Sequence, residues 1–337
     1  MIGIFVLVLG NKLILIESFQ KDACWQCSAY NCSFQFVIHI SVILFIFQVQ
    51  VFYMKKLFVV IILLLAGNLI FAQQKPAYVL YDVNGKKVSY KKMIKQLAKK
   101  DVLLFGEFHN NPIAHWLELV VAKDLKEKKE ILFGAEMFEA DNQQPLNDYL
   151  AGRITAKGLD SSARLWNNYK TDYAPIVNFA KEIKAPFIAT NIPRRYAALV
   201  SKKGFESLDT LSALEKSWMA PLPMDYDSTL PGYVNMLKMM GGHGSANMPK
   251  AQASKDATMA YFILQNLKPG TLFIHYNGSY HSDNFDGINW YLKRKRPELN
   301  IATISTVSQK NIKELLAENK GKADFIICVD EDMTNTY

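Results

Sequence analysis

The sequence contains few cysteines, and most of them lie at one end. There are 4 in 337 residues, and Cys24, Cys27 and Cys32 account for three of them. The fourth, Cys328, stands inside the apolar run FIICV. One thiol cannot form an internal disulfide, so a disulfide framework is excluded for the chain after residue 32.

Concentrated positive charge is also scarce. The formal net charge is +8, but Lys and Arg are spread along the chain. One dense cluster, Lys-Arg-Lys-Arg at 293–296, directly precedes Pro297. This position is typical of a helix C-terminus, where cations interact favourably with the helix dipole. We therefore expect no nucleic-acid partner.

The sequence lacks the helical zinc motif of metallopeptidases. None of its 6 His residues has another His four positions away, which the HExxH motif requires. A zincin-type peptidase is therefore disfavoured.

A secretory signal peptide is predicted over residues 54–72. Two lysines follow Met54, residues 57–66 are apolar, and Ala72 is the small residue at the expected cleavage site. The mature chain would be residues 73–337, in the periplasm or secreted. No cysteine follows the apolar stretch directly, so we expect no lipid anchor.

The 53 residues before Met54 show no usable helix or strand period. A signal peptide should begin at the N-terminus, so we interpret residues 1–53 as upstream sequence that is not part of the native protein, or as unstructured. The alternative is a membrane segment at 36–52. Its roughly 17 residues are at the short end for a spanning helix.

The rest of the chain alternates short apolar runs with longer amphipathic stretches, which is typical of an α/β fold. We predict a three-layer α/β/α domain with a largely parallel sheet covered on both faces. The expected strands are 78–83, 102–106, 131–137, 186–190, 272–276, 300–305 and 325–329. The expected helices are 89–99, 113–126, 141–150, 158–168, 172–184, 193–202, 251–267, 286–295 and 311–319.

Residues 205–250 differ from the rest because they lack strand patterns and are rich in Pro, Gly and Met. We interpret them as a helical insert or lid over the working edge of the sheet, with a hinge at 241–244. Flexible Met side chains can adapt to a large apolar ligand. The alternative is ordinary Met packing in a small helical core.

Polar side chains follow each of the four inner strands. Glu107 and His109 come after the first, Glu136 and Glu139 belong to the second, and Asn191 ends the third, with Arg194 shortly after. His281 follows the fourth. The carboxyl ends of parallel strands share one edge of a sheet, where ligands bind, so these side chains should converge.

The pattern Gly-x-x-His occurs twice, at 106–109 and 278–281. We expect each Gly to allow a sharp turn after its strand. His109, Glu136 and His281 could bind a divalent metal, or could act as a base and its orienting group around a water. The plainer reading is that Glu107 caps a helix and His109 is a hydrogen-bonded turn residue.

The other histidines are expected to have structural or undefined positions. His115 lies on a predicted helix, as a surface or packing residue, and His275 lies inside a strand, as a hydrogen-bonded core residue. His243, in its Gly-rich loop, could be solvated or could be a ligand from the lid.

These motifs resemble the ChaN type of haem-binding uptake proteins, in the group that includes Tiki, TraB and erythromycin esterase. The similarity covers about residues 102–329. It rests on GE-x-H at 106–109, Glu136, Trp166, Tyr173-x-Pro175, ATNIPR at 189–194, Ala251-Gln252, Asp256-x-x-Met259-Ala260 and NG-x-x-H at 277–281.

The resemblance implies an exported haem-binding protein of iron or haem uptake. It implies haem as the ligand, a Tyr axial ligand, a homodimer that stacks two haems, and an outer-membrane receptor as a partner. Arg194 and Arg195 could pair with the haem propionates. The expected haem-binding residues are His109, Tyr173, Asn191, Arg194, Tyr226 and His281.

The Tiki and esterase branches of the same group imply a second function, hydrolysis. In that reading His109 activates water, Glu107 or Glu136 orients it or binds a metal, and His281 completes the site. A third alternative is a structural domain with a vestigial site.

Overall fold

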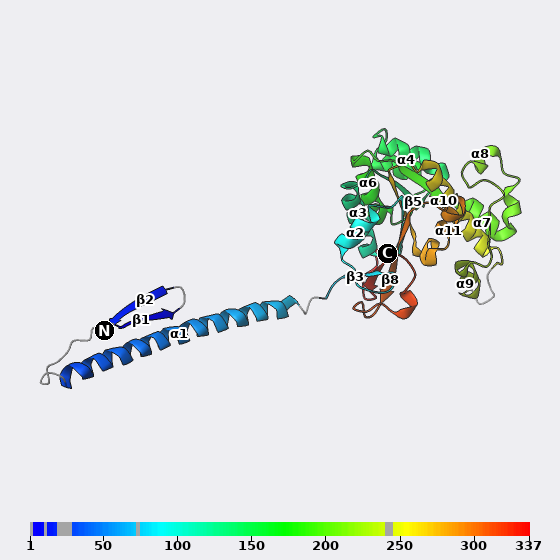
Figure 1. The fold of residues 1–337 in the computed structure, drawn as a ribbon. Helices are drawn as coiled ribbons and strands as arrows, with labels where there is room; N and C mark the ends of the chain where they lie inside the picture. The colour runs from blue at the N-terminus through cyan, green and yellow to red at the C-terminus, as the bar shows by residue number, and fades with distance from the viewer. Residues whose placement is uncertain (1–2, 10–11, 19–28, 72–74, 240–244) are drawn as a thin grey trace. The chain divides into compact units, whose positions relative to one another are not determined.

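The structure is a computed structural model that describes residues 3–9, 12–18, 29–71, 75–239 and 245–337. The chain divides into two compact units, Met1–Lys75 and Pro76–Tyr337 (Figure 1). The second unit carries all of the site residues predicted above.

The first unit consists of a hairpin and one long helix. Strand β1 (Gly3–Leu9) pairs antiparallel with β2 (Lys12–Ser18), and α1 runs over Ala29–Phe71. The described residues of this unit are therefore strand and helix. The interpretation of residues 1–53 as upstream sequence or as unstructured chain stays a prediction. An apolar helix has no polar stripe, so its sequence shows no 3.6-residue period.

Helix α1 contains one segment, Ile38–Ile62, that is long and apolar enough to cross a membrane. It includes most of the alternative membrane segment at 36–52 and the start of the predicted signal peptide. The expected cleavage position after Ala72 lies outside the described residues.

The second unit is built on a seven-stranded sheet, which confirms the predicted α/β class with a largely parallel sheet. The strand order is β3-β9-β8-β4-β7-β5-β6. Only β3, at one edge, runs antiparallel to its neighbour, and the other pairs are parallel. The strands are β3 (Tyr78–Asp82), β4 (Val102–Glu107), β5 (Ile131–Glu139), β6 (Phe187–Asn191), β7 (Leu272–Gly278), β8 (Ile301–Gln309) and β9 (Phe325–Asp330).

Helices cover both faces of this sheet, as the three-layer prediction requires (Figure 1). Alternate residues of β4 enter different cores, because successive side chains of a strand point to opposite faces. Leu103 and Phe105 pack with α2 (Tyr90–Leu97), α3 (Pro112–Lys126), α4 (Gln143–Leu150), α5 (Ala156–Ser162) and α6 (Ala174–Glu182). Val102 and Leu104 pack with α7 (Arg194–Lys203), α10 (Met248–Asn266) and α11 (Ile288–Lys295).

The helix starts follow local chemistry in the sequence. Ser89 caps α2 by accepting a hydrogen bond from the Lys92 backbone N–H. Asn111 caps α3 by accepting from the N–H groups of Ile113 and Ala114, and Pro112 occupies the first helical position. The cap at Asn111 fixes where the chain turns after His109.

The predicted helix 311–319 is wrong. Its place is taken by a loop that ends in a 3₁₀ turn at Ala317–Asn319. The buried Gln309 side chain donates to the Asn311 and Glu314 carbonyl oxygens and accepts from the Leu316 N–H. Backbone groups that a helix would pair internally are satisfied by this one amide instead.

The predicted helix 158–168 is also too long, since α5 ends at Ser162. The Arg164 backbone N–H donates to the Asn142 side chain at 2.7 Å, so the chain leaves the helical path there.

Residues 205–250 contain only helical elements among those described. These are a 3₁₀ turn at Phe205–Leu208, α8 (Ala213–Lys216), α9 (Pro231–Met239) and the start of α10 at Met248. Met219 and Met224 are buried in the core shared with α7, α10 and α11, whereas Met239 is 72% exposed. Ordinary packing therefore explains two of the methionines, and the predicted hinge at 241–244 lies outside the described residues.

Candidate functional site

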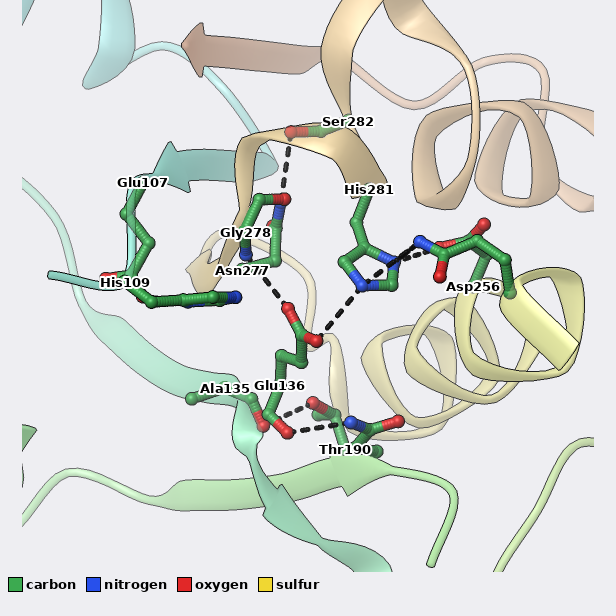
Figure 2. Close-up of polar contacts among 12 residues, drawn as sticks. Glu107, His109, Ala135, Glu136, Thr190, Asp256, Asn277, Gly278, His281 and Ser282 are labelled. Atoms are coloured by element: carbon green, nitrogen blue, oxygen red, sulfur yellow. Dashed lines mark hydrogen bonds and ion pairs between the residues drawn. The ribbon is translucent and has the colours of Figure 1, made fainter. Parts of the chain in front are cut away.

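Glu107 and His109 form a dyad at the carboxyl end of β4. The buried Glu107 places Oε1 2.7 Å from His109 Nδ1 and accepts a hydrogen bond from the Tyr173 hydroxyl at 2.8 Å. His109 Nε2 is directed toward Gly278 and Glu136 (Figure 2). The reading of Glu107 as a helix cap is wrong, because Asn111 caps the following helix.

The glycines of the two Gly-x-x-His motifs act differently from the prediction. Neither Gly106 nor Gly278 has a positive φ, and both belong to strands. A Cβ at Gly278 would lie 2.8 Å from His109 Nε2, and one at Gly106 would lie 2.8 Å from the Ile304 carbonyl oxygen. These glycines are needed for close approach and not for a sharp turn.

Glu136, His281 and Asp256 form a second chain of buried polar groups beside the first. Glu136 Oε1 lies 3.0 Å from His281 Nε2, and Glu136 Oε2 accepts from the Gly278 backbone N–H at 2.9 Å. His281 Nδ1 lies 2.5 Å from Asp256 Oδ1. Figure 2 shows the two imidazoles on either side of Glu136, so the predicted convergence of Glu107, His109, Glu136 and His281 is present.

The electrostatics of this pair favour charged forms at neutral pH. Burial alone would raise the pKa of Glu136, but His281 outweighs it and holds this pKa well below its usual range. Burial would lower the pKa of His281, but Glu136 and Asp256 raise it to about 9. Burial also opposes the charged form of His109, while its hydrogen bond with Glu107 raises the pKa of that imidazole.

His115 belongs to the site region. Of the two predicted alternatives it is a packing residue and not a surface residue, because it is buried and its ring meets the Tyr173 ring edge-on with centroids 5.2 Å apart. Its Nδ1 lies 3.1 Å from Glu107 Oε2 and 3.2 Å from Glu118 Oε2, and all three side chains are buried. Burial would lower the pKa of His115, but hydrogen bonds with Glu107 and Glu118 raise it to about 11. Burial and the charge of Glu107 raise the pKa of Glu118 well above its usual value.

Two adjoining cavities open beside His109. A cavity of about 280 Å³ is lined by His109, Glu136 and Lys255 among others. A larger one of about 750 Å³ shares Glu139, Trp166 and Arg194 with it. The His109 side chain is 34% exposed, and its ring meets the Trp166 ring edge-on with centroids 4.8 Å apart.

The cations around these cavities divide into paired and unpaired ones. Arg164 pairs with Glu139 and Asp141, and Arg195 pairs with Asp141. Among the described residues, Arg194 and Lys255 form no ion pair. The two unpaired cations therefore remain available to an anionic ligand, whereas Arg195 is already engaged.

The other predicted haem-binding residues lie in different surroundings. Asn191 lines the smaller cavity and donates from Nδ2 to the Glu136 carbonyl oxygen. Its buried Oδ1 has no hydrogen-bond partner among the described residues. The Tyr173 hydroxyl is buried against Glu107. Tyr226 packs against Phe205 and Tyr233 in the insert and lines neither cavity.

Two further histidines in the sequence are His275 and His243. His275 is a fully buried strand residue whose ring contacts Thr190 and Asn277, which confirms its predicted core position. His243 lies outside the described residues.

The predicted metal set does not form a compact donor group. In the part of the chain that the structure describes, one group of three offers donor atoms within 4.8 Å of one another, and it is Glu107, His115 and Glu118. Both nitrogens of His281 are engaged by carboxylates.

Sequence reasoning missed several residues of this region. His115, Glu118, Lys255 and Asp256 all lie on helices and not at the strand ends that guided the prediction. One signal was available: His115 and Glu118 are three apart on the buried face of α3, and titratable groups on a buried face need partners.

One protein family and several solved structures are similar to this chain. A family described as "Haem-binding uptake, Tiki superfamily, ChaN" matches residues 93–292. A solved structure described as cofacial haem binding to ChaN of Campylobacter jejuni is 18% identical, with a TM-score of 0.57. The alignment covers 76% of this chain and 98% of that chain.

More distant structures share less of the fold. An erythromycin esterase mutant in its open conformation is 10% identical with a TM-score of 0.44, over 74% of this chain and 97% of its own. A Bacillus cereus protein is also 10% identical with a TM-score of 0.44, over 71% and 90%. No curated protein sequence matches the chain.

The family match spans more than half of the chain and includes both polar chains around the cavity. The protein therefore belongs to the ChaN family of haem-binding uptake proteins, within the Tiki superfamily.

Proposed function

We propose that the protein binds haem in the cavities beside His109 and serves haem or iron uptake. The observation that carries the proposal is a partly exposed imidazole, His109, whose Nδ1 is held by a buried carboxylate. A hydrogen bond at one ring nitrogen fixes the ring orientation and leaves the other nitrogen to a ligand. His109 lines the smaller cavity, and its Nε2 is directed toward Gly278 and Glu136.

The surrounding residues fit the needs of a porphyrin. Trp166 supplies an aromatic wall shared by both cavities. Arg194 and Lys255 are cations without ion pairs among the described residues, and Arg can pair with a propionate as a two-pronged donor. When bound, haem would supply its iron as the centre for an axial ligand.

We favour His109 over Tyr173 as the axial ligand. A tyrosine binds iron best as its phenolate, but burial and the neighbouring Glu107 raise the pKa of Tyr173 far above its usual value. Its hydroxyl also donates to Glu107. Tyr173 then orients Glu107, which in turn orients His109.

A haemin titration of the purified protein tests this proposal. We expect a Soret band that saturates at one haem per chain. His109→Ala should shift or abolish the band, whereas Tyr173→Phe should keep it. Arg194→Ala should weaken binding about tenfold, or about 1.4 kcal/mol, while the exposed Lys268→Ala serves as a control. A wild-type chain without a Soret change would exclude the proposal, and an unchanged His109→Ala band would exclude this ligand.

We also propose that the protein is exported and pairs with a second copy. The segment 54–72 is the expected export signal, and cofacial haem binding by the Campylobacter jejuni ChaN supports a homodimer that brings two haems together. N-terminal sequencing distinguishes a mature start after Ala72 from a membrane-retained α1. Size-exclusion chromatography with and without haemin tests the dimer. An outer-membrane receptor stays a prediction.

Hydrolysis is the second candidate function. The observation in its favour is that the His109–Glu107 dyad faces an ionised Glu136 across a cavity large enough for water, an arrangement that can position a general base. A screen with activated esters tests it: activity that disappears in His109→Ala while haemin gives no Soret band would favour the hydrolase.

A further inference from the structure

The buried side chains of Glu107, His115 and Glu118 contain more hydrogen-bond acceptors than donors. His115 Nδ1 lies 3.1 Å from Glu107 Oε2 and 3.2 Å from Glu118 Oε2. One imidazole N–H cannot donate well to both oxygens. Glu107 Oε2 and Glu118 Oε1 are both buried and have no hydrogen-bond partner among the described residues. Buried polar atoms in folded proteins are nearly always satisfied, so these two indicate a missing cation or proton.

The surroundings of His115 Nε2 indicate that this nitrogen carries a proton. His115 Nε2 lies 3.1 Å from the His109 carbonyl oxygen and 3.6 Å from Asp172 Oδ2, and both are acceptors. Nε2 therefore donates. When a metal ion displaces the proton from Nδ1, the lone pair of that nitrogen lies between the two carboxylates. Metal-binding histidines characteristically donate their second N–H to a carbonyl or carboxylate in this way.

The donor spacing also suits a metal ion. Two ligands at about 2.0–2.2 Å from a metal, separated by about 90–110°, lie roughly 2.9–3.5 Å apart. The distances of 3.1 and 3.2 Å from Nδ1 fall in this range, and all three donor atoms lie within 4.8 Å of one another. Two carboxylates and one neutral imidazole also balance a dication.

We propose that Glu107, His115 and Glu118 bind a divalent transition-metal ion of the Zn²⁺ or Mn²⁺ type behind the haem cavity. One imidazole nitrogen and two carboxylate oxygens are donors that these ions accept. The site does not depend on the haem proposal, because its ligands His115 and Glu118 line neither cavity. It is also distinct from the edge set of His109, Glu136 and His281.

Metal analysis of the full chain tests the site. The chain is produced in medium with added ZnCl₂ or MnCl₂, purified without chelator, and assayed by plasma mass spectrometry, with manganese followed by electron paramagnetic resonance. We expect about one equivalent in the wild type and less than about a tenth of that in Glu118→Gln. Glu127→Gln, an exposed change just after the same helix, should retain the full equivalent.

Two further readings separate the proposal from its rivals. His109→Ala should keep the metal if the ion lies behind β4. If His109→Ala loses the ion and Glu118→Gln retains it, the ion is bound at the cavity and the proposal is overturned. A wild type without metal would also overturn it. In that case the carboxylates share a proton, and Glu118→Gln should melt at or above the wild-type temperature because its amide can donate to Glu107.

Discussion

At the scale of single residues, the site depends on which side chains the ends of neighbouring strands bring next to His109. The sequence was sufficient to predict that Glu107, His109, Glu136 and His281 meet, because each lies near the carboxyl end of a parallel strand or just after it, and such strands end at one edge. It did not predict that His281 would be held by Asp256, since that residue lies on α10 and its approach depends on how the helix packs.

Gly278 offers a test of the site that leaves every polar group in place. A Cβ at this position would lie 2.8 Å from His109 Nε2 and 2.9 Å from its Cε1. We expect Gly278→Ala to displace the imidazole and to weaken haemin binding about tenfold, or about 1.4 kcal/mol. In Gly232→Ala the new methyl would meet only ordinary contacts, the nearest at 3.6 Å, so affinity should not change. Equal affinities in both variants would contradict this role for Gly278.

Gly106→Ala should affect stability more than binding. Its Cβ would meet backbone atoms, the Ile304 carbonyl oxygen at 2.8 Å and the Ser279 Cα at 2.9 Å, and backbone moves less easily than a side chain. We expect a loss of about 1–3 kcal/mol in the free energy of unfolding, measured by urea denaturation. A variant as stable as the wild type would show that β4 and β8 can separate slightly.

At the scale of elements, strands and long helices were predicted well and short connections poorly. The strands 102–106, 131–137 and 272–276 are apolar runs whose identity follows from burial on both faces. The segment 311–319 has a plausible helical pattern, but the Gln309 side chain takes over its backbone hydrogen bonds. A contact of that kind cannot be read from periodicity, because it depends on a residue outside the segment.

Gln309→Ala tests this explanation. The buried amide serves the Asn311, Glu314 and Leu316 backbone groups, so its loss should reduce stability by about 1–3 kcal/mol. Cleavage by trypsin at Lys310 or Lys313 should also become faster. Gln265→Ala, an exposed change, is the matched control. If the loop resists trypsin as well in Gln309→Ala as in the control, other contacts hold it.

At the scale of the whole molecule, one buried imidazole makes the fold sensitive to acid. Burial lowers the pKa of His275 to about 4 from its usual 6.5. The unfolded chain then binds more protons than the folded chain between these two values. The contribution of His275 is complete above pH 6.5 and is lost as the pH falls toward 4.

We therefore expect the free energy of unfolding to fall by up to about 3 kcal/mol from this group between pH 6.5 and 4. Urea unfolding at several pH values measures it. His275→Asn should be less stable at pH 7 but should show a shallower decline across the window. Parallel curves for the two proteins would mean that another group governs the acid response.

The two compact units give a second prediction at this scale. Residues 76–337 contain the whole seven-stranded sheet and the three hydrophobic clusters packed on it, so this part should fold alone. We expect its melting temperature to lie within about 2 °C of that of the longer chain, measured by circular dichroism. A drop of ten degrees would show that the first unit contributes to the stability of the second.

The two oxygens of Glu107 face different histidines. Oε1 lies 2.7 Å from His109 Nδ1, and Oε2 lies 3.1 Å from His115 Nδ1. A ligand on the imidazole in front of β4 and a cation behind it would therefore compete for the electron density of the same carboxylate. Linkage then requires reciprocity: by whatever factor the ion alters the affinity of the cavity for its ligand, the ligand must alter the retention of the ion by that same factor. Binding on one side of the end of β4 would therefore change binding on the other side.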